Sequence, residues 1–190
     1  MTLTSQIQVS AQSLNMTISP DGKQLLFFAQ GYIGVVDISS GTLGAVTAIS
    51  QNPVLSGSPN GAQGFANGVY IGSRSIALVA PSGVTIFDVT TPSAPTIVGS
   101  LGFANQQTSS GLIGYAAAYV KSTGLTYLVV NNTFYVLNAS VPASPYIEGS
   151  ATLQSGSGFV GSDPASISTT SDGSVAYVVS QGLLNVVTIP

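Results

Sequence analysis

A sixteen-residue pattern that recurs about every fifty residues constrains this chain more than any other feature of its sequence. In the clearest copy, residues 84–99, an apolar run ends at Asp88, a Pro-x-x-Pro loop follows, and a second apolar run leaves the loop. Further copies lie at residues 134–149, where Asn138 replaces the aspartate, and, in weaker or truncated form, at residues 34–41 and 184–190. Such a period is typical of repeat proteins, in which each unit is one supersecondary structure stacked on its neighbours.

Short β-strands are the regular elements that the sequence predicts. No stretch of eleven or more residues combines a 3.6-residue apolar period with helix caps. Short apolar runs between Gly, Asn and Pro turns predict four strands in each of the first three units and three strands in the last. The units span about residues 11–50, 68–101, 114–153 and 165–190.

A tight turn is predicted at the same point of the first and last units. Ser19-Pro20-Asp21-Gly22 and Thr170-Ser171-Asp172-Gly173 each lead into an apolar run. In such turns aspartate bonds the local backbone and glycine accepts a positive φ. The shared turn aligns the two units, although the last one lacks the Pro-x-x-Pro loop.

Four small sheets repeated around an axis form a β-propeller. The strands nearest the axis need small side chains, and the first strand of the later units carries several, namely Gly68, Gly114, Ala116, Ala117, Ala118 and Ala165. We therefore predict an all-β fold, a small β-propeller of about four four-stranded blades, as a single domain over residues 1–190. Residues 2–10 alternate polar and apolar side chains and have no local partner, so we expect them to pair beside residues 183–189 and close the ring.

The repeat resembles a known family. The loop segment Asp88-Val89-Thr90-Thr91-Pro92-Ser93-Ala94-Pro95, followed by Ile97-Val98-Gly99, resembles the LVIVD repeat of bacterial and archaeal surface β-propellers. The turn Ser19-Pro20-Asp21-Gly22-Lys23 is similar to that of the related YVTN propeller repeats. The resemblance covers most of the chain, with two units matching well and the other two in part. It implies a propeller fold and an extracellular setting, and it implies no activity.

The composition excludes several classes of function. Only three Lys and Arg residues are present, too few for the basic surface that nucleic acids require. Cys and His are absent, which removes thiolate nucleophiles, disulfides, the commonest general base and the commonest metal ligands. The longest apolar runs are about six residues, against about 20 for a membrane-spanning helix, so we expect no membrane insertion. Charged residues make up 5% of the chain, a sparseness that is similar to exterior proteins of archaea or their viruses.

The acidic residues are expected to be structural. Asp37, Asp88 and Asn138 occupy equivalent strand ends, where each side chain can accept a backbone N–H bond in an Asx turn. Paired acid catalysis would need two carboxylates within about 5–10 Å, which one acid per unit does not indicate. Asp163 and Asp172 lack the spacing of a calcium loop. The sequence leaves open whether backbone carbonyls on the axis of the ring hold an ion.

The other candidate features also have simpler interpretations. Glycine-rich residues 61–64, 111–114 and 156–161 do not lead from a strand into a helix, so phosphate binding is not indicated. Five aromatic residues could form a sugar-stacking platform but fit a β core better: Tyr32, Tyr70, Phe103, Tyr115 and Tyr119. We therefore expect no catalytic residues, no cofactor and no metal ligands.

Asparagine glycosylation is the one modification that the sequence suggests. Acceptor sequons begin at Asn15, Asn131 and Asn138. Asn131 is predicted to lie in an accessible hairpin turn and Asn138 at a strand end, whereas Asn15 falls in a predicted inner strand. Asn131 and Asn138 are the candidate acceptors.

The expected function is that of a non-catalytic structural or interaction module, located outside the cell or on a virion surface. Its expected partners are other protein subunits of a virion or cell-surface assembly, in which the chain is a subunit or an adaptor. The alternative is a carbohydrate-binding or adhesion propeller, with glycans as partners, and an enzyme is third.

Overall fold

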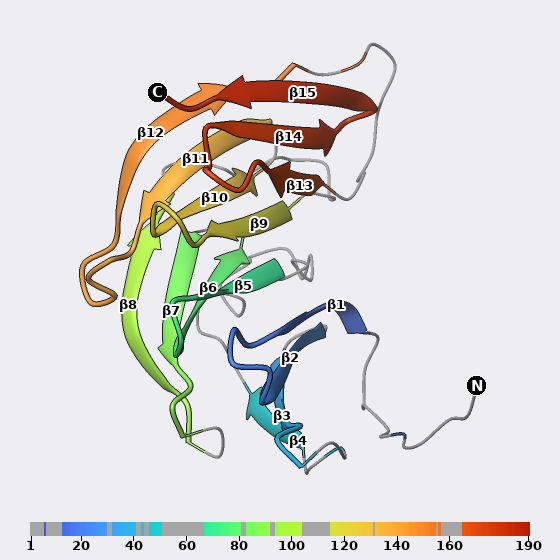
Figure 1. The fold of residues 1–190 in the computed structure, drawn as a ribbon, viewed down its shortest axis with the longest axis vertical. Helices are drawn as coiled ribbons and strands as arrows, with labels where there is room; N and C mark the ends of the chain where they lie inside the picture. Colours follow the sequence, from blue (N-terminus) through green and yellow to red (C-terminus); the bar gives the residue numbers. More distant parts are fainter. Residues whose placement is uncertain are drawn as a thin grey trace.

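The computed structural model describes residues 6, 13–29, 32–40, 43, 46–50, 67–80, 83–91, 94–103, 115–130, 132–154, 156 and 165–190. All regular structure in these residues is β, in four antiparallel sheets whose strands follow chain order. The sheets lie side by side along an arc (Figure 1). No helix in the described part of the chain is long and apolar enough to cross a membrane.

Each sheet is one blade. Blade 1 contains β1 (Ser13–Ile18), β2 (Gln24–Ala29), β3 (Tyr32–Asp37) and β4 (Val46–Ser50). Blade 2 contains β5 (Asn67–Ile71), β6 (Ser75–Ala80), β7 (Gly83–Asp88) and β8 (Thr96–Gly102). Blade 3 contains β9 (Tyr115–Val120), β10 (Leu125–Val130), β11 (Thr133–Asn138) and β12 (Tyr146–Thr152). Blade 4 contains β13 (Ser166–Thr169), β14 (Val175–Ser180) and β15 (Leu183–Thr188).

The turn between the first two strands of blades 1 and 4 has the predicted chemistry. Gly22 and Gly173 have φ angles of 70° and 78°, a conformation that side chains other than glycine disfavour. The hydroxyl of Ser19 accepts the Gln24 N–H at 2.9 Å, and that of Thr170 accepts the Val175 N–H at 3.1 Å. The hydroxyls therefore satisfy the backbone at the point where β2 and β14 begin.

The core lies between the blades rather than within any one sheet. Leu26 and Val35 of blade 1 pack against Tyr70, Ile76 and Phe87 of blade 2. The next two interfaces repeat this arrangement, between blades 2 and 3 and between blades 3 and 4. Because successive residues of a strand point to opposite faces, blades 2 and 3 each bury one face on the preceding blade and the other on the following blade.

The predicted fold class is confirmed, with three four-stranded blades and one three-stranded blade in the described residues. The inner strands β1, β5, β9 and β13 contact one another in that order. Gly68, Ala116 and Ala165 are buried on or beside them, as the axial crowding predicts, whereas Ala117 and Ala118 are half-buried. Gly114 lies outside the described residues.

The expected closure of the ring is not seen in the structure. Within the described residues the four sheets form an open arc, with blades 1 and 4 at its two ends (Figure 1). The segment expected to close it, residues 2–10, lies outside the described residues except for Gln6. Its pairing with β15, and the assignment of residues 1–190 to one domain, stay predictions.

Candidate functional site

The strand-end residues singled out from the repeat form Asx turns. An Oδ1 atom of Asp37, Asp88 and Asn138 accepts the backbone N–H two residues further along the chain, at 2.8, 2.8 and 3.0 Å. They lie at the ends of β3, β7 and β11, one in each of three blades. The structural interpretation of these side chains is confirmed, because each one holds its own loop.

Hydrogen bonds within their own loops lower the pKa values of four aspartates. Hydrogen bonds from the Thr90 hydroxyl and N–H hold the pKa of Asp88 below its usual range. The same kind of bond, from Ser39 to Asp37, from Ser19 to Asp21 and from Thr170 to Asp172, lowers the pKa of each of these carboxyls. A carboxyl with a lowered pKa that is bound to its own loop is poorly suited to act as a general acid.

We expect the melting temperature to change little between pH 7 and about pH 5 and to fall at lower pH. Loop hydrogen bonds hold the pKa values of the same four aspartates below their ordinary range in the folded chain. A carboxyl whose pKa is depressed by folding adds stability above its unfolded pKa, and this stability is lost as the pH falls through the folded pKa. Thermal unfolding followed by circular dichroism from pH 7 to pH 2 measures this. A decline that begins well above pH 5 would contradict this account, because unfolded carboxyls bind protons only below about that pH.

The structure describes two of the three sequon asparagines, and the side-chain amide of each makes hydrogen bonds. Asn138 is half-buried, and its Nδ2 atom donates to the Tyr146 hydroxyl at 3.0 Å and to Glu148 Oε1 at 2.7 Å. A glycan on this nitrogen would have to displace both bonds. Asn131 lies outside the described residues. Asn15 Nδ2 donates to Asn67 Oδ1 at 2.6 Å, which joins the inner strands of blades 1 and 2.

Three of the five aromatic residues that were weighed as a sugar-stacking platform lie in or against the core between blades. Tyr70 is 2% exposed in the core between blades 1 and 2. Phe103 stacks on Tyr135 with ring centroids 4.8 Å apart, and both rings and Tyr119 pack against the core between blades 2 and 3. The core interpretation is confirmed for these side chains. Nothing in the described residues places the side chains of Tyr32 and Tyr115.

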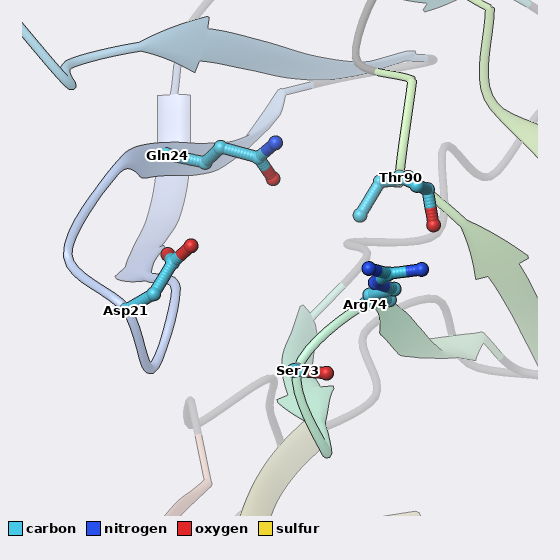
Figure 2. A pocket seen from close by; sticks show the side chains of 6 residues that line it. Asp21, Gln24, Ser73, Arg74 and Thr90 are labelled. Atoms are coloured by element: carbon cyan, nitrogen blue, oxygen red, sulfur yellow. The ribbon is translucent and has the colours of Figure 1, made fainter.

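A small polar pocket of about 180 Å³ lies between blades 1 and 2. It is lined by Asp21, Gln24, Ser73, Arg74, Val89 and Thr90. Figure 2 shows Asp21 and Gln24 on one side, facing the Ser73–Arg74 turn and Thr90 on the other. The sequence did not point to Gln24, Ser73 or Arg74. Gln24 begins β2 and the other two lie in the turn before β6, about fifty residues later, so only the packing of the blades brings them together.

The pocket contains one anionic side chain, Asp21, and one cationic side chain, Arg74. Tyr70 donates its hydroxyl to Gln24 Oε1 at 3.4 Å, and burial, with a smaller effect of Asp21, raises the pKa of Tyr70 to about 12. Tyr70 is therefore a neutral donor that orients the amide. The polar groups suit a small hydroxyl-bearing ligand, and no group of three metal-binding side chains occurs in the described residues. Asp163, the other half of the weighed calcium pair, lies outside them.

A second candidate site is an apolar surface on blade 4, at one end of the arc. Its members are Tyr177 (44% exposed), Val179 (48%), Leu184 (64%) and Val186 (61%). Tyr177 pairs with Val186 and Val179 pairs with Leu184 across β14 and β15, so the four side chains lie on one face of the sheet. The sequence pattern did not reveal this surface, since equivalent apolar residues in the other blades are buried.

Comparisons with known proteins identify the fold and no family. No protein-family model matches the sequence, and no curated protein matches it. Among solved structures, the chain is similar to a periplasmic gluconolactonase from Pseudomonas aeruginosa, with a TM-score of 0.65 and 14% identity over 86% of this chain and 48% of that one.

Two further structures give the same result. The chain is similar to the C-terminal WD40 domain of Sif2, with a TM-score of 0.64 and 13% identity over 97% of this chain and 48% of that one. The β-propeller domain of Cps50 (Swd1) from Myceliophteria thermophila gives a TM-score of 0.59 and 11% identity over 95% and 52%. The chain thus spans about half the length of these structures. At these identities the similarity concerns the fold alone, and the chain has the fold of a β-propeller.

Proposed function

We propose that this chain is a non-catalytic structural and interaction module, a subunit or adaptor of an extracellular assembly on a cell or virion surface. The observation that carries the proposal is the apolar surface of blade 4, defined by Tyr177, Val179, Leu184 and Val186. Exposed apolar patches on soluble proteins mark sites of protein interaction. The resemblance to LVIVD-type surface propellers supports the extracellular setting.

The neighbours of this surface favour a protein partner. On the same face, β13 contributes Ser166 and Ser168, which pair with Val179 and Tyr177. Both serines are exposed and neutral. An apolar centre beside neutral polar side chains matches the apolar core and polar border of protein interfaces. The residues named on this surface carry no charge with which to bind a charged ligand.

A photo-crosslinking residue at position 186 tests the proposal in the native setting. Val186 lies on the surface, and Val141, which is 60% exposed on a loop of blade 3, is the matched control position. We expect position 186, and not position 141, to cross-link to a defined protein subunit on intact particles or cells. The absence of cross-links at position 186, or equal cross-linking at both positions, would contradict the proposal.

The proposal also predicts no hydrolytic activity. One structural relative is a gluconolactonase, so gluconolactone is an informative substrate. We expect no turnover above the rate in buffer, because the sequence has no His or Cys and the aspartates Asp21 and Asp88 are bound within their own loops. A rate that is abolished by Asp21→Asn or Arg74→Ala would overturn this expectation and assign catalysis to the pocket between blades 1 and 2.

Carbohydrate binding is the second candidate, and the same polar pocket favours it. Asp21, Gln24, Arg74 and Thr90 offer the donors and acceptors that sugar hydroxyls need. A glycan array tests this candidate directly. Binding that is lost in Arg74→Ala and retained in Val141→Ala would support it over a purely structural role.

A further inference from the structure

We propose that the apolar surface of blade 4 is covered by blade 1 of a second copy of this chain, so that two arcs close a ring head to tail. This inference rests on the proposed function, because it names the partner of the surface described there. In each of blades 1 to 3, we call the sheet face that packs on the following blade the forward face, and the opposite one the backward face.

The strand registers show which residues are equivalent in the four blades. The pairs Gln24–Asp37, Ser75–Asp88, Leu125–Asn138 and Val175–Thr188 occupy the same place in the second and third strands of each blade. Counting from them, Tyr177 corresponds to Leu26, Ala77 and Tyr127. Val186 corresponds to Val35, Ile86 and Val136, and Leu184 corresponds to Val84 and Phe134.

These equivalent positions differ sharply in exposure. Leu26, Ala77 and Tyr127 are all 0% exposed on forward faces, whereas Tyr177 is 44% exposed. Val35, Ile86 and Val136 are 1%, 0% and 8% exposed, whereas Val186 is 61% exposed. Val84 and Phe134 are each 1% exposed, whereas Leu184 is 64% exposed. Blade 4 therefore carries the forward face of a propeller blade without a blade on it in the described structure.

Blade 1 offers the complementary backward face. Ile18 is 58% exposed, although its equivalent Tyr70 is 2% exposed on the backward face of blade 2. Met16, which pairs with Phe27 on the same face, is 67% exposed. Phe27 and Val36 on this face are only 4% and 0% exposed, with Leu25, Ile38 and Leu43 packed against them. Met16 and Ile18 of β1 therefore form its exposed apolar part. The forward face of blade 4 and the exposed β1 part of the backward face of blade 1 thus lie at the two ends of the arc (Figure 1).

A second copy of the chain is the expected partner of the blade 4 surface, because the chain already repeats this kind of interface. Forward face packs on backward face three times within the chain, so the same contact between copies continues an existing interface. The chain covers 48–52% of the length of the solved propellers to which it is similar, so two copies together have about the length of one of those chains. The net charge of −3 per copy opposes association only weakly. A head-to-tail contact that closes after two copies forms a ring with twofold symmetry.

Two double variants of the full chain test the proposal by sedimentation velocity. Leu184→Asp with Val186→Asp disrupts the forward face of blade 4, and Met16→Asp with Ile18→Asp disrupts the backward face of blade 1. All four side chains are more than half exposed, so aspartate fits the isolated fold. Val141→Asp, at a loop residue that is 60% exposed, is the control. Far-ultraviolet circular dichroism checks the fold of each variant.

We expect the unaltered chain and the control to be dimers without larger species. Each double variant alone should dissociate at least about 100-fold more readily, because charges replace two apolar side chains in both interfaces of the ring. An equimolar mixture of the two double variants should form a heterodimer, since one forward and one backward face remain intact. Only a head-to-tail contact predicts that the mixture forms dimers when each double variant alone does not.

Other outcomes overturn the inference. If the blade 1 variant stays dimeric while the blade 4 variant is monomeric, two blade 4 surfaces pack on each other; the second copy is then docked differently, and the proposed function stands. A monomeric unaltered chain, at concentrations up to about 100 μM, excludes a second copy, and cross-linking at position 186 then decides the proposed function by itself. Open chains of increasing length would show that the head-to-tail contact does not close.

Discussion

Replacement of Tyr127 by alanine is expected to lower the free energy of unfolding by about 3–5 kcal/mol, as deletion of a buried aromatic ring does. Tyr127 is 0% exposed between blades 3 and 4, where its ring lies 5.5 Å from that of Phe134. Its hydroxyl donates to the Gly173 carbonyl at 2.6 Å, in the turn between β13 and β14. The substitution removes both the packing and the hydrogen bond that hold blade 4 on blade 3.

Tyr177→Ala is the matched control, because Tyr177 occupies the equivalent position one blade later and is 44% exposed. At protein concentrations low enough to keep the chain monomeric, this change should alter the free energy of unfolding by less than about 1 kcal/mol. Urea unfolding of both variants measures the difference. Equal losses would show that the forward face of blade 4 is covered within a single chain, and would count against the open arc.

The hydroxyl of Tyr127 can be separated from its ring. Tyr127→Phe keeps the packing and leaves the Gly173 carbonyl without this donor, which costs about 1–3 kcal/mol when the acceptor is buried. The order alanine, phenylalanine, unaltered chain in rising stability is therefore expected.

The architecture was predictable from local sequence signals. The turn at Asp172-Gly173 and the Asx positions Asp37 and Asp88 are each encoded within a few neighbouring residues, and each is confirmed. The recurrence of the pattern about every fifty residues matches the four successive sheets. Turn chemistry depends on local backbone conformation, so it can be recognised in a single sequence.

The exposure of individual residues was not predictable in this way. Tyr127 and Tyr177 are the same residue type at the same register of equivalent strands, yet one is buried and the other is exposed. The difference arises from whether a blade lies on the forward face, and that depends on the path of the whole chain. The pocket at Arg74 was missed for the same reason, since its walls come from two blades.

The structure also explains the Pro-x-x-Pro loop that defines the repeat. In blade 3 this loop follows β11, and its Pro142 carbonyl approaches Gly99 of β8 in blade 2. A Cβ atom added at Gly99 would lie 1.9 Å from the Pro142 oxygen. The loop of one blade therefore rests on the outer strand of the preceding blade, and it needs a glycine beneath it.

Gly99→Ala is accordingly expected to destabilise the chain by about 1–3 kcal/mol, the range typical of overpacked sites, because the obstructing atom belongs to the backbone and not to a flexible side chain. Gly149 is the control, since it occupies the equivalent position on β12 and a Cβ atom there would meet nothing within 4 Å. Gly149→Ala should be neutral or slightly stabilising, as alanine restricts the unfolded chain more than glycine does. Urea unfolding of the two variants compares them directly. A smaller loss for Gly99→Ala than for Gly149→Ala would mean that the loop of blade 3 does not rest on blade 2, and that the packing of neighbouring outer strands is not what the repeat encodes.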